Sequence, residues 1–127
     1  MAKTIAEFEQ RVGEWCIECF GETVAADVVE RNWRFLEEAL ELVQSLGGGK
    51  EDALKLVDYV FDRQLGEPQQ EVGGVMVTLA ALTYANEIDL HVAANRELHR
   101  IERPEVMQKI RQKHQSKPHR SSLPGSE

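Results

Sequence analysis

The sequence has few of the residues that mark specialised classes of protein. Its 127 residues include two cysteines, four prolines and only 6% aromatic residues. Two cysteines are too few for a disulfide-rich secreted scaffold. No uninterrupted apolar run approaches the roughly 18 residues that a membrane-spanning helix needs, and the N-terminus has no basic flank before an apolar segment. These absences predict a soluble, cytoplasmic protein without a membrane partner.

Positive charge is also scarce. Fifteen Lys and Arg residues stand against 22 Asp and Glu residues, which gives a formal net charge of -7. Binding to a phosphate backbone needs clustered Lys and Arg, so polymeric nucleic acid is excluded as the main partner. An acidic protein can still bind a small anionic ligand through a metal ion. The length predicts one domain, which buries roughly two-thirds of the surface of its unfolded chain.

The two cysteines form the segment Cys16-Ile17-Glu18-Cys19. A CxxC motif can bind zinc or act in redox chemistry, but zinc needs four ligands and a redox motif needs a βαβ setting. The sequence has no second cysteine pair, and its four histidines lie far away without ligand-like spacing. We therefore expect two reduced cysteines packed on a helix.

The segment from residue 34 to 46 dominates the pattern. Apolar residues recur in it at steps of three and four, and the same stripe extends back to Val29, which predicts a helix. The residues of the stripe are Val29, Trp33, Leu36, Leu40 and Val43. Glu38 and Glu41 are three residues apart and Glu37 and Glu41 four, so their side chains are neighbours on that helix. The face is either solvated or a Mg²⁺ site, because two carboxylates one turn apart offer convergent oxygen ligands.

Arg31 and Arg34 lie one and two turns before these acids. They either pair with glutamates of the same helix or point at a phosphate group beside the metal.

A second acidic position is Glu71, which directly precedes the neutral segment 72–86. A carboxylate beside a buried run is costly unless it is paired or bound to a metal, which makes Glu71 the natural partner of Glu38 and Glu41. Gly73 and Gly74 follow inside the same predicted helix. Each costs about 1 kcal/mol relative to alanine, so we expect either another helix or a ligand to come close there.

The remaining pattern is also helical. Period-two alternation is absent, and glycine or proline clusters separate the helical runs. One run starts between residues 23 and 27 and ends at 46. The others are 4–21, 50–64, 68–86, 89–101 and 104–114. These predict an all-α domain over residues 1–114, a bundle of four to five helices. Residues 115–127 are predicted to form a disordered tail. Basic residues between 107 and 120 either are solvated or close over an anionic substrate; they are Lys109, Arg111, Lys113, Lys117 and Arg120.

Two of these segments resemble motifs of a known family. The run Leu36-Glu37-Glu38-Ala39-Leu40-Glu41-Leu42 resembles the EExxEL motif of the MazG-like, all-α nucleoside triphosphate pyrophosphohydrolases, and Glu71-Val72-Gly73-Gly74 falls at their ExxD motif. Residues 85–90 resemble the segment before the family's last core helix. The resemblance covers residues 27–111.

The resemblance implies hydrolysis of a nucleoside triphosphate to a monophosphate and pyrophosphate. It assigns Glu38, Glu41 and Glu71 as Mg²⁺ ligands and Glu37 as a further catalytic acid that positions water. It also implies a homodimer or homotetramer. Asn95 and Arg100 correspond to nucleotide or phosphate contacts on the last core helix, with Arg34 as a further substrate contact, whereas Glu97 stands where a lysine is expected.

One departure from the family pattern leaves alternatives open. Gly74 stands where ExxD has its aspartate, so one oxygen ligand is missing. Three glutamates suffice if Mg²⁺ binds through few carboxylates plus substrate phosphates, or Asp58, Asp62 or Asp89 completes the site. The alternative function is a catalytically weakened module that binds a nucleotide or metal, and a third is a helical interaction protein.

Overall fold

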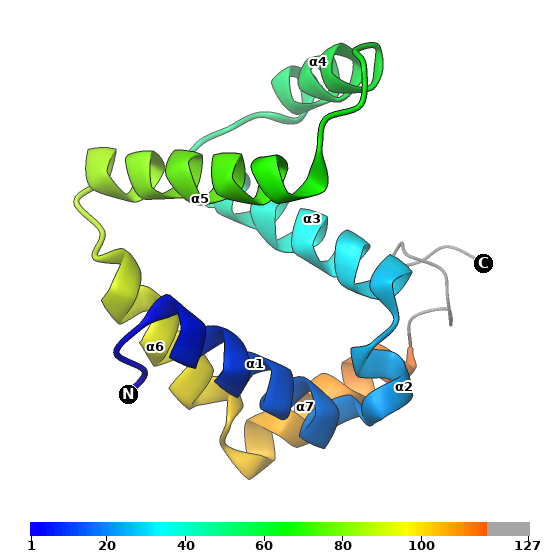
Figure 1. Ribbon diagram of the computed structural model, residues 1–127, viewed down its shortest axis with the longest axis vertical. Helices are drawn as coiled ribbons and strands as arrows, with labels where there is room; N and C mark the ends of the chain where they lie inside the picture. Colours follow the sequence, from blue (N-terminus) through cyan, green and yellow to red (C-terminus); the bar gives the residue numbers. More distant parts are fainter. Residues whose placement is uncertain (117–127) are drawn as a thin grey trace. The chain divides into compact units, whose positions relative to one another are not determined.

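The computed structural model describes residues 1–116, and this part of the chain is helical and has no strand (Figure 1). Its seven helices are α1 (Ile5–Phe20), α2 (Glu22–Ala25), α3 (Val28–Ser45), α4 (Lys50–Phe61), α5 (Pro68–Ala85), α6 (Leu90–Ile101) and α7 (Pro104–Gln115). The predicted all-α class is confirmed, although the described chain has more helices than the four to five expected. Residues 117–127, which carry most of the predicted tail, lie outside the described residues.

Local sequence signals set several helix ends. The Thr4 hydroxyl accepts a hydrogen bond from the Glu7 amide at 3.0 Å, as the capping pattern predicts. Gly47 has φ 93°, the left-handed conformation that ends α3. Pro68 begins α5, where its missing N–H costs no hydrogen bond. Sequence alone therefore locates these ends.

The start of α3 differs in detail from the expectation. Residues Glu22–Ala25 form a separate short helix, α2, and α3 begins at Val28. The Asp27 carboxylate accepts hydrogen bonds from the amides of Val29 and Glu30, each at 3.2 Å. A side chain that satisfies the first amides of a helix fixes its start, so Asp27 separates the two helices.

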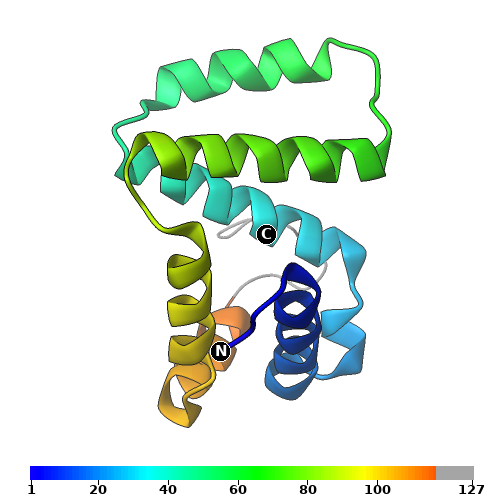
Figure 2. The same cartoon turned by 60° about the vertical axis from the view of Figure 1, so that its left-hand side comes forward.

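The chain divides into two compact units. The first joins Met1–Glu37 to the described residues from His91 onward, and the second is Glu38–Leu90. In the first unit α1, α6 and α7 enclose an apolar core (Figure 2). Its buried members are Trp15, Cys19, Leu98 and Met107, with partly buried side chains around them.

Polar contacts close this core at its edges. The Trp15 indole Nε1 donates to the Ile101 carbonyl at 2.8 Å, and Nη2 of Arg11 donates to both oxygens of Glu102 at 2.8 Å. Nε of Arg111 donates to the Cys19 carbonyl at 2.8 Å, which caps the last turn of α1. One of the basic residues expected to be solvated or to meet a substrate therefore joins α7 to α1.

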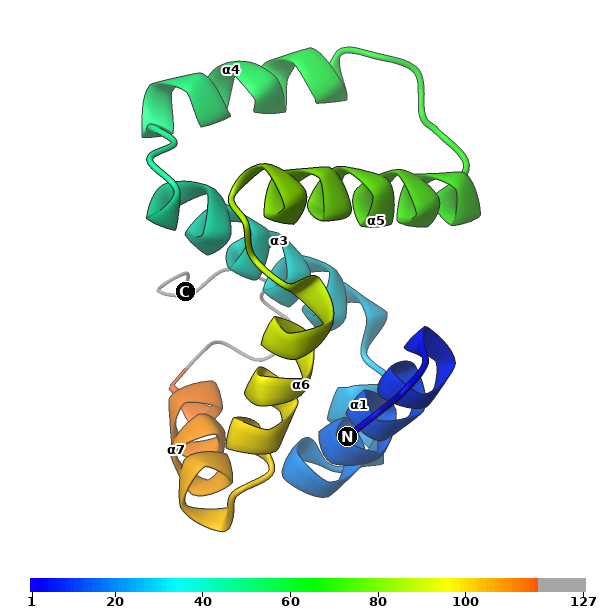
Figure 3. The same ribbon diagram turned by 90° about the vertical axis from the view of Figure 1, so that its left-hand side faces the viewer.

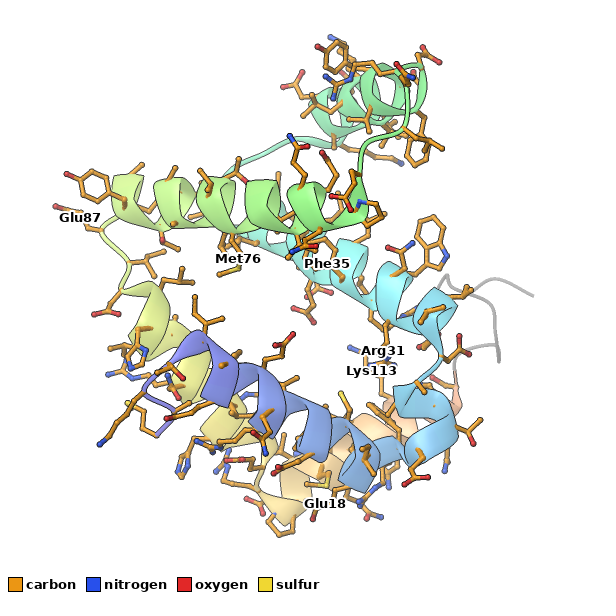
Figure 4. All side chains as sticks on the ribbon, viewed as in Figure 1. Glu18, Arg31, Phe35, Met76, Glu87 and Lys113 are labelled. Atoms are coloured by element: carbon orange, nitrogen blue, oxygen red, sulfur yellow. The ribbon has the colours of Figure 1, made fainter. Side chains whose placement is uncertain are left out.

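The second unit contains the end of α3 and the helices α4 and α5, which run in opposite directions (Figure 3). Its only buried residue is Thr83. Each large apolar side chain of this unit is either half-buried or at least 38% exposed. The exposed set is Leu40, Val43, Leu46, Leu54, Leu56, Val57, Tyr59, Val60, Phe61, Leu65, Val72, Val75, Met76, Val77, Tyr84 and Ile88. Figure 4 shows the side chains of α4 and α5, Met76 among them, projecting from the ribbons.

None of the described helices is both long and apolar enough to span a membrane.

Candidate functional site

The acidic residues of α3 fall on both sides of the boundary between the units. Glu37 belongs to the first unit, where it is half-buried and accepts a hydrogen bond from Arg34 Nη1 at 2.9 Å. Glu38 and Glu41 belong to the second unit and are exposed. Because they are three residues apart on a continuous helix, their carboxylates share one face.

Glu71 lies in the first turn of α5, in the same unit as Glu38 and Glu41, and is exposed. Its side chain folds back toward the preceding loop, because a Cβ added at Gly66 would come within 2.9 Å of the Glu71 carboxylate. Within residues 1–116, however, no three acidic, histidine or cysteine side chains gather in a group that could hold a metal ion. The α3 pair and Glu71 thus share a unit but do not form a three-ligand cluster.

Gly74, at the position of the expected aspartate, lies one turn after Glu71. A Cβ built on Gly74 meets no atom within 4 Å. Since residues three apart are neighbours on a helix, a side chain at this position would extend beside Glu71. Space therefore does not exclude a carboxylate at position 74.

A buried charge cluster surrounds Glu30 at the start of α3. Glu30 is 4% exposed. Its Oε1 lies 3.2 Å from Arg34 Nε, 3.8 Å from Arg31 Nη2 and 3.7 Å from His114 Nδ1. Arg34 also bonds Glu37, so the pairing of this arginine within its own helix, one of the two alternatives, is what the structure contains.

Arg31 and His114 both contact Phe20 at the end of α1. The Arg31 guanidinium lies 5.4 Å from the Phe20 ring centre, and the His114 ring lies 4.8 Å from it. Nε and Nη2 of Arg31 are buried and have no hydrogen-bond acceptor among the described residues. The spacing of Glu30 and Arg34 was visible in the sequence, but the approach of His114 from α7 was not.

The two predicted contacts on α6 are engaged within the first unit. Asn95 is buried, its Oδ1 accepts from the Ala2 amide at 3.0 Å, and its Nδ2 donates to the His91 carbonyl at 3.0 Å. Arg100 donates two hydrogen bonds to Glu97, at 2.8 and 2.7 Å, and these bonds hold the pKa of Glu97 below its ordinary value. To contact a nucleotide, Asn95 would have to release the N-terminal segment.

Both cysteines are free thiols that form no disulfide, as expected from the lone CxxC. Cys19 is buried, and burial raises the pKa of its thiol, only partly offset by the nearby Arg111. A thiol held neutral is a poor nucleophile and a poor metal ligand.

The chain was compared with protein-family models, with curated proteins and with solved structures, and none of them matches it. The exposed carboxylates of α3 and α5 suit a hard cation, since carboxylate oxygens are the ligands that Mg²⁺ prefers. They repel a phosphate ester unless such a cation lies between the two.

Proposed function

We propose that the protein is a Mg²⁺-dependent nucleoside triphosphate pyrophosphohydrolase. The observation that supports this most is the position of three glutamates in one compact unit. Glu38 and Glu41 are exposed one turn apart on α3, and Glu71 is exposed in the first turn of α5. These are the glutamates to which the EExxEL and ExxD resemblance assigns the metal.

The donor chemistry fits Mg²⁺ in part. Glu38 and Glu41 supply two carboxylates on one helical face, and Mg²⁺ can bind through one or two carboxylates while substrate phosphates and water fill its other positions. Glu71 is not gathered with them into a group within the described residues. We therefore assign the ion to the α3 pair first, with Glu71 as the third ligand of the proposed site. When bound, such an ion offsets the charge of the triphosphate.

The residues of the chain itself would position the reactants. In the hydrolysis, a water oxygen attacks the α-phosphorus, the bond to the pyrophosphate oxygen breaks, and the water proton passes to a carboxylate. Glu37 is the proposed acceptor, and its bond to Arg34 at 2.9 Å orients its carboxylate. Arg34 remains a proposed substrate contact through N–H groups other than the Nη1 that binds Glu37. The resemblance alone supports Asn95 and Arg100 as substrate contacts, and each would have to give up the hydrogen bonds that it makes in the first unit.

The test is pyrophosphate release from a panel of ordinary and modified nucleoside triphosphates, with and without Mg²⁺. We expect metal-dependent release that falls at least 100-fold in Glu41→Ala, about the size of one lost electrostatic contact to the transition state. Circular dichroism should be unchanged, because Glu41 is exposed. Glu51→Ala, at an exposed acid of α4, is the matched control and should retain full activity. Absence of release from every substrate would contradict hydrolysis.

A second candidate is a module that binds a nucleotide or Mg²⁺ without turnover. Gly74 favours it, because the carboxylate expected one turn after Glu71 is missing although the position is open. In that case Gly74→Asp should strengthen Mg²⁺ binding measured by calorimetry and create pyrophosphate release that the wild type lacks. A wild type with full activity, or a Gly74→Asp variant with unchanged metal affinity, would remove the reason for this candidate.

We also propose that the protein works as a homodimer or homotetramer. The resemblance to the MazG-like proteins supports this, and so does the number of large apolar side chains that the second unit leaves exposed.

A further inference from the structure

Cys16 and Cys19 are two thiols that the proposed hydrolysis does not use. They are three residues apart on α1, and both pack against the apolar core of the first unit, so they lie on one side of the helix. Cys16 is half-buried and Cys19 is buried. Burial is the main reason why the pKa of the Cys19 thiol is raised, and the neighbouring Cys16 adds to the rise. A partly accessible thiol therefore lies beside a sheltered one.

The spacing of the two cysteines permits a disulfide, but only with strain. Residues three apart on a helix have Cα atoms about 5 Å apart, which suits a disulfide, but Cβ atoms about 5–6 Å apart, whereas a disulfide needs roughly 3.5–4.5 Å. Closing this gap distorts the helix locally. Cys19 directly precedes Phe20, the last residue of α1, so the distortion falls on the last turn. A disulfide strained in this way is easily reduced.

The last turn of α1 is also the place where α7 is attached. Arg111 of α7 donates from Nε to the Cys19 carbonyl at 2.8 Å and from Nη2 to the Glu18 carbonyl at 3.1 Å. The Cys19 Sγ lies 4.0 Å from the carbonyl oxygen of Met107, which also belongs to α7. Turning Cys19 toward Cys16 moves its sulfur and its carbonyl away from these partners. The oxidation state of the thiols is thus coupled to the packing of α7.

We propose that Cys16 and Cys19 form a reversible redox switch, which a low-molecular-weight disulfide such as oxidised glutathione closes and which loosens α7 from α1. The Cys16 thiolate attacks one sulfur of oxidised glutathione and releases a glutathione thiolate. Cys19 then attacks the Cys16 sulfur, and the bond from that sulfur to the second glutathione breaks. The two protein thiols lose two electrons and two protons, and one glutathione disulfide becomes two glutathione thiols. The proposal does not rest on the proposed hydrolysis.

Catalysis of redox exchange in other proteins fits this pair less well. Catalytic CxxC pairs are activated at helix N-termini, where the helix dipole stabilises a thiolate. Cys16 and Cys19 lie at the opposite end of α1, and burial raises the pKa of Cys19. Transient disulfides that are not catalytic are mostly redox-sensing. The pair is therefore assigned to the control of this protein.

The experiment treats the folded protein with oxidised glutathione at pH 8 and stops the reaction with acid. After the reagent is removed, iodoacetamide in denaturant blocks free thiols, and mass spectrometry weighs the chain. We expect the wild type to lose two hydrogens, to take up no alkyl group and to recover both thiols with dithiothreitol. Cys19→Ala should stop at one glutathione bound to Cys16, and Cys16→Ala should keep a reduced Cys19. A wild type that retains glutathione on Cys16, that links to other chains or that stays reduced overturns the proposal.

Hydrogen exchange on the wild type measures the consequence for α7, and it keeps the proposal testable if a cysteine variant does not fold. After oxidation, the amides of α7 and of the last turn of α1 should exchange at least tenfold faster than in the reduced protein. Those of α4, in the other unit, should keep their rate. Arg111→Gln is the matched variant, since it removes the same attachment without oxidation and should loosen α7 in the reduced protein. A disulfide that forms while exchange in α7 is unchanged contradicts the switch.

Discussion

Glu30 is a buried carboxylate that is surrounded by basic side chains. Its carboxylate is 4% exposed and faces Arg31, Arg34 and His114, and none of these contacts has the alignment of a hydrogen bond to Oε1. Buried charges are stable only when they are paired. Glu30 therefore offsets the positive charge of Arg31 and Arg34.

We expect Glu30→Gln to lower the free energy of unfolding by about 2 kcal/mol, less than for a fully buried pair because Arg31 keeps 30% of its side chain exposed. The amide removes the negative charge that faces Arg31 and Arg34, whereas Arg34 keeps its ion pair with Glu37. Urea denaturation followed by circular dichroism measures the change. Glu9→Gln, at an exposed position of α1, is the control and should stay within about 0.5 kcal/mol of wild type. Equal stability of Glu30→Gln and Glu9→Gln would contradict this role.

Cys19 gives a pH-dependent prediction. Since burial raises the pKa of its thiol in the folded state, the unfolded chain loses this proton first as pH rises. The contribution to stability is thus constant below the ordinary thiol pKa, about 8.5, and declines above it. We expect iodoacetamide at pH 8 to label the half-buried Cys16 first and Cys19 only in denaturant, as read by mass spectrometry. Equal labelling of both thiols in the folded protein would show that Cys19 is accessible.

Among the helices, α3 shows what an amphipathic pattern can predict and what it cannot. Its apolar stripe predicted a helix, and the helix is present from Val28 to Ser45. The same stripe is poorly covered, since Val29, Leu36, Leu40 and Val43 are each at least 39% exposed. Periodicity identifies the apolar side of a helix, but it does not say what packs against it.

The end of α3 depends on one glycine. Gly47 has φ 93°, which side chains other than glycine adopt only with strain. Gly47→Ala should lower the free energy of unfolding by about 1 kcal/mol. Gly13→Ala is a suitable control that should not lower the free energy of unfolding, because Gly13 lies within α1 without a positive φ and a Cβ there meets nothing within 4 Å. Thermal denaturation of both variants tests this, and a Gly47→Ala protein as stable as wild type would be incompatible with a left-handed residue at this position.

At the scale of the whole molecule, apolar surface is distributed unequally between the two units. The first has a core built on Trp15, Cys19, Leu98 and Met107, whereas the second buries only Thr83 within the described residues. The proposed metal ligands Glu38, Glu41 and Glu71 all belong to the unit without a core. Their arrangement is therefore expected to depend on what covers that unit.

A ligand that binds only the folded protein raises its melting temperature by mass action. We expect Mg²⁺ with a non-hydrolysable nucleotide to stabilise the wild type by about 2.7 kcal/mol at 100 times the dissociation constant, and Mg²⁺ alone to stabilise it less. Glu38→Ala should lose this gain, and Glu51→Ala should keep it. Differential scanning fluorimetry provides the measurement. A Glu38→Ala protein stabilised as much as wild type would remove Glu38 from the site.

The sequence by itself determined the helical class, most helix ends and the exposed face shared by Glu38 and Glu41, because these depend on local spacing, caps and glycine conformation. Only the tertiary structure placed His114 beside Glu30, buried Asn95 against Ala2 and used Arg111 to cap α1. Those contacts join residues between 84 and 93 positions apart in the chain, and a pattern with the period of a helix carries no information about such pairs.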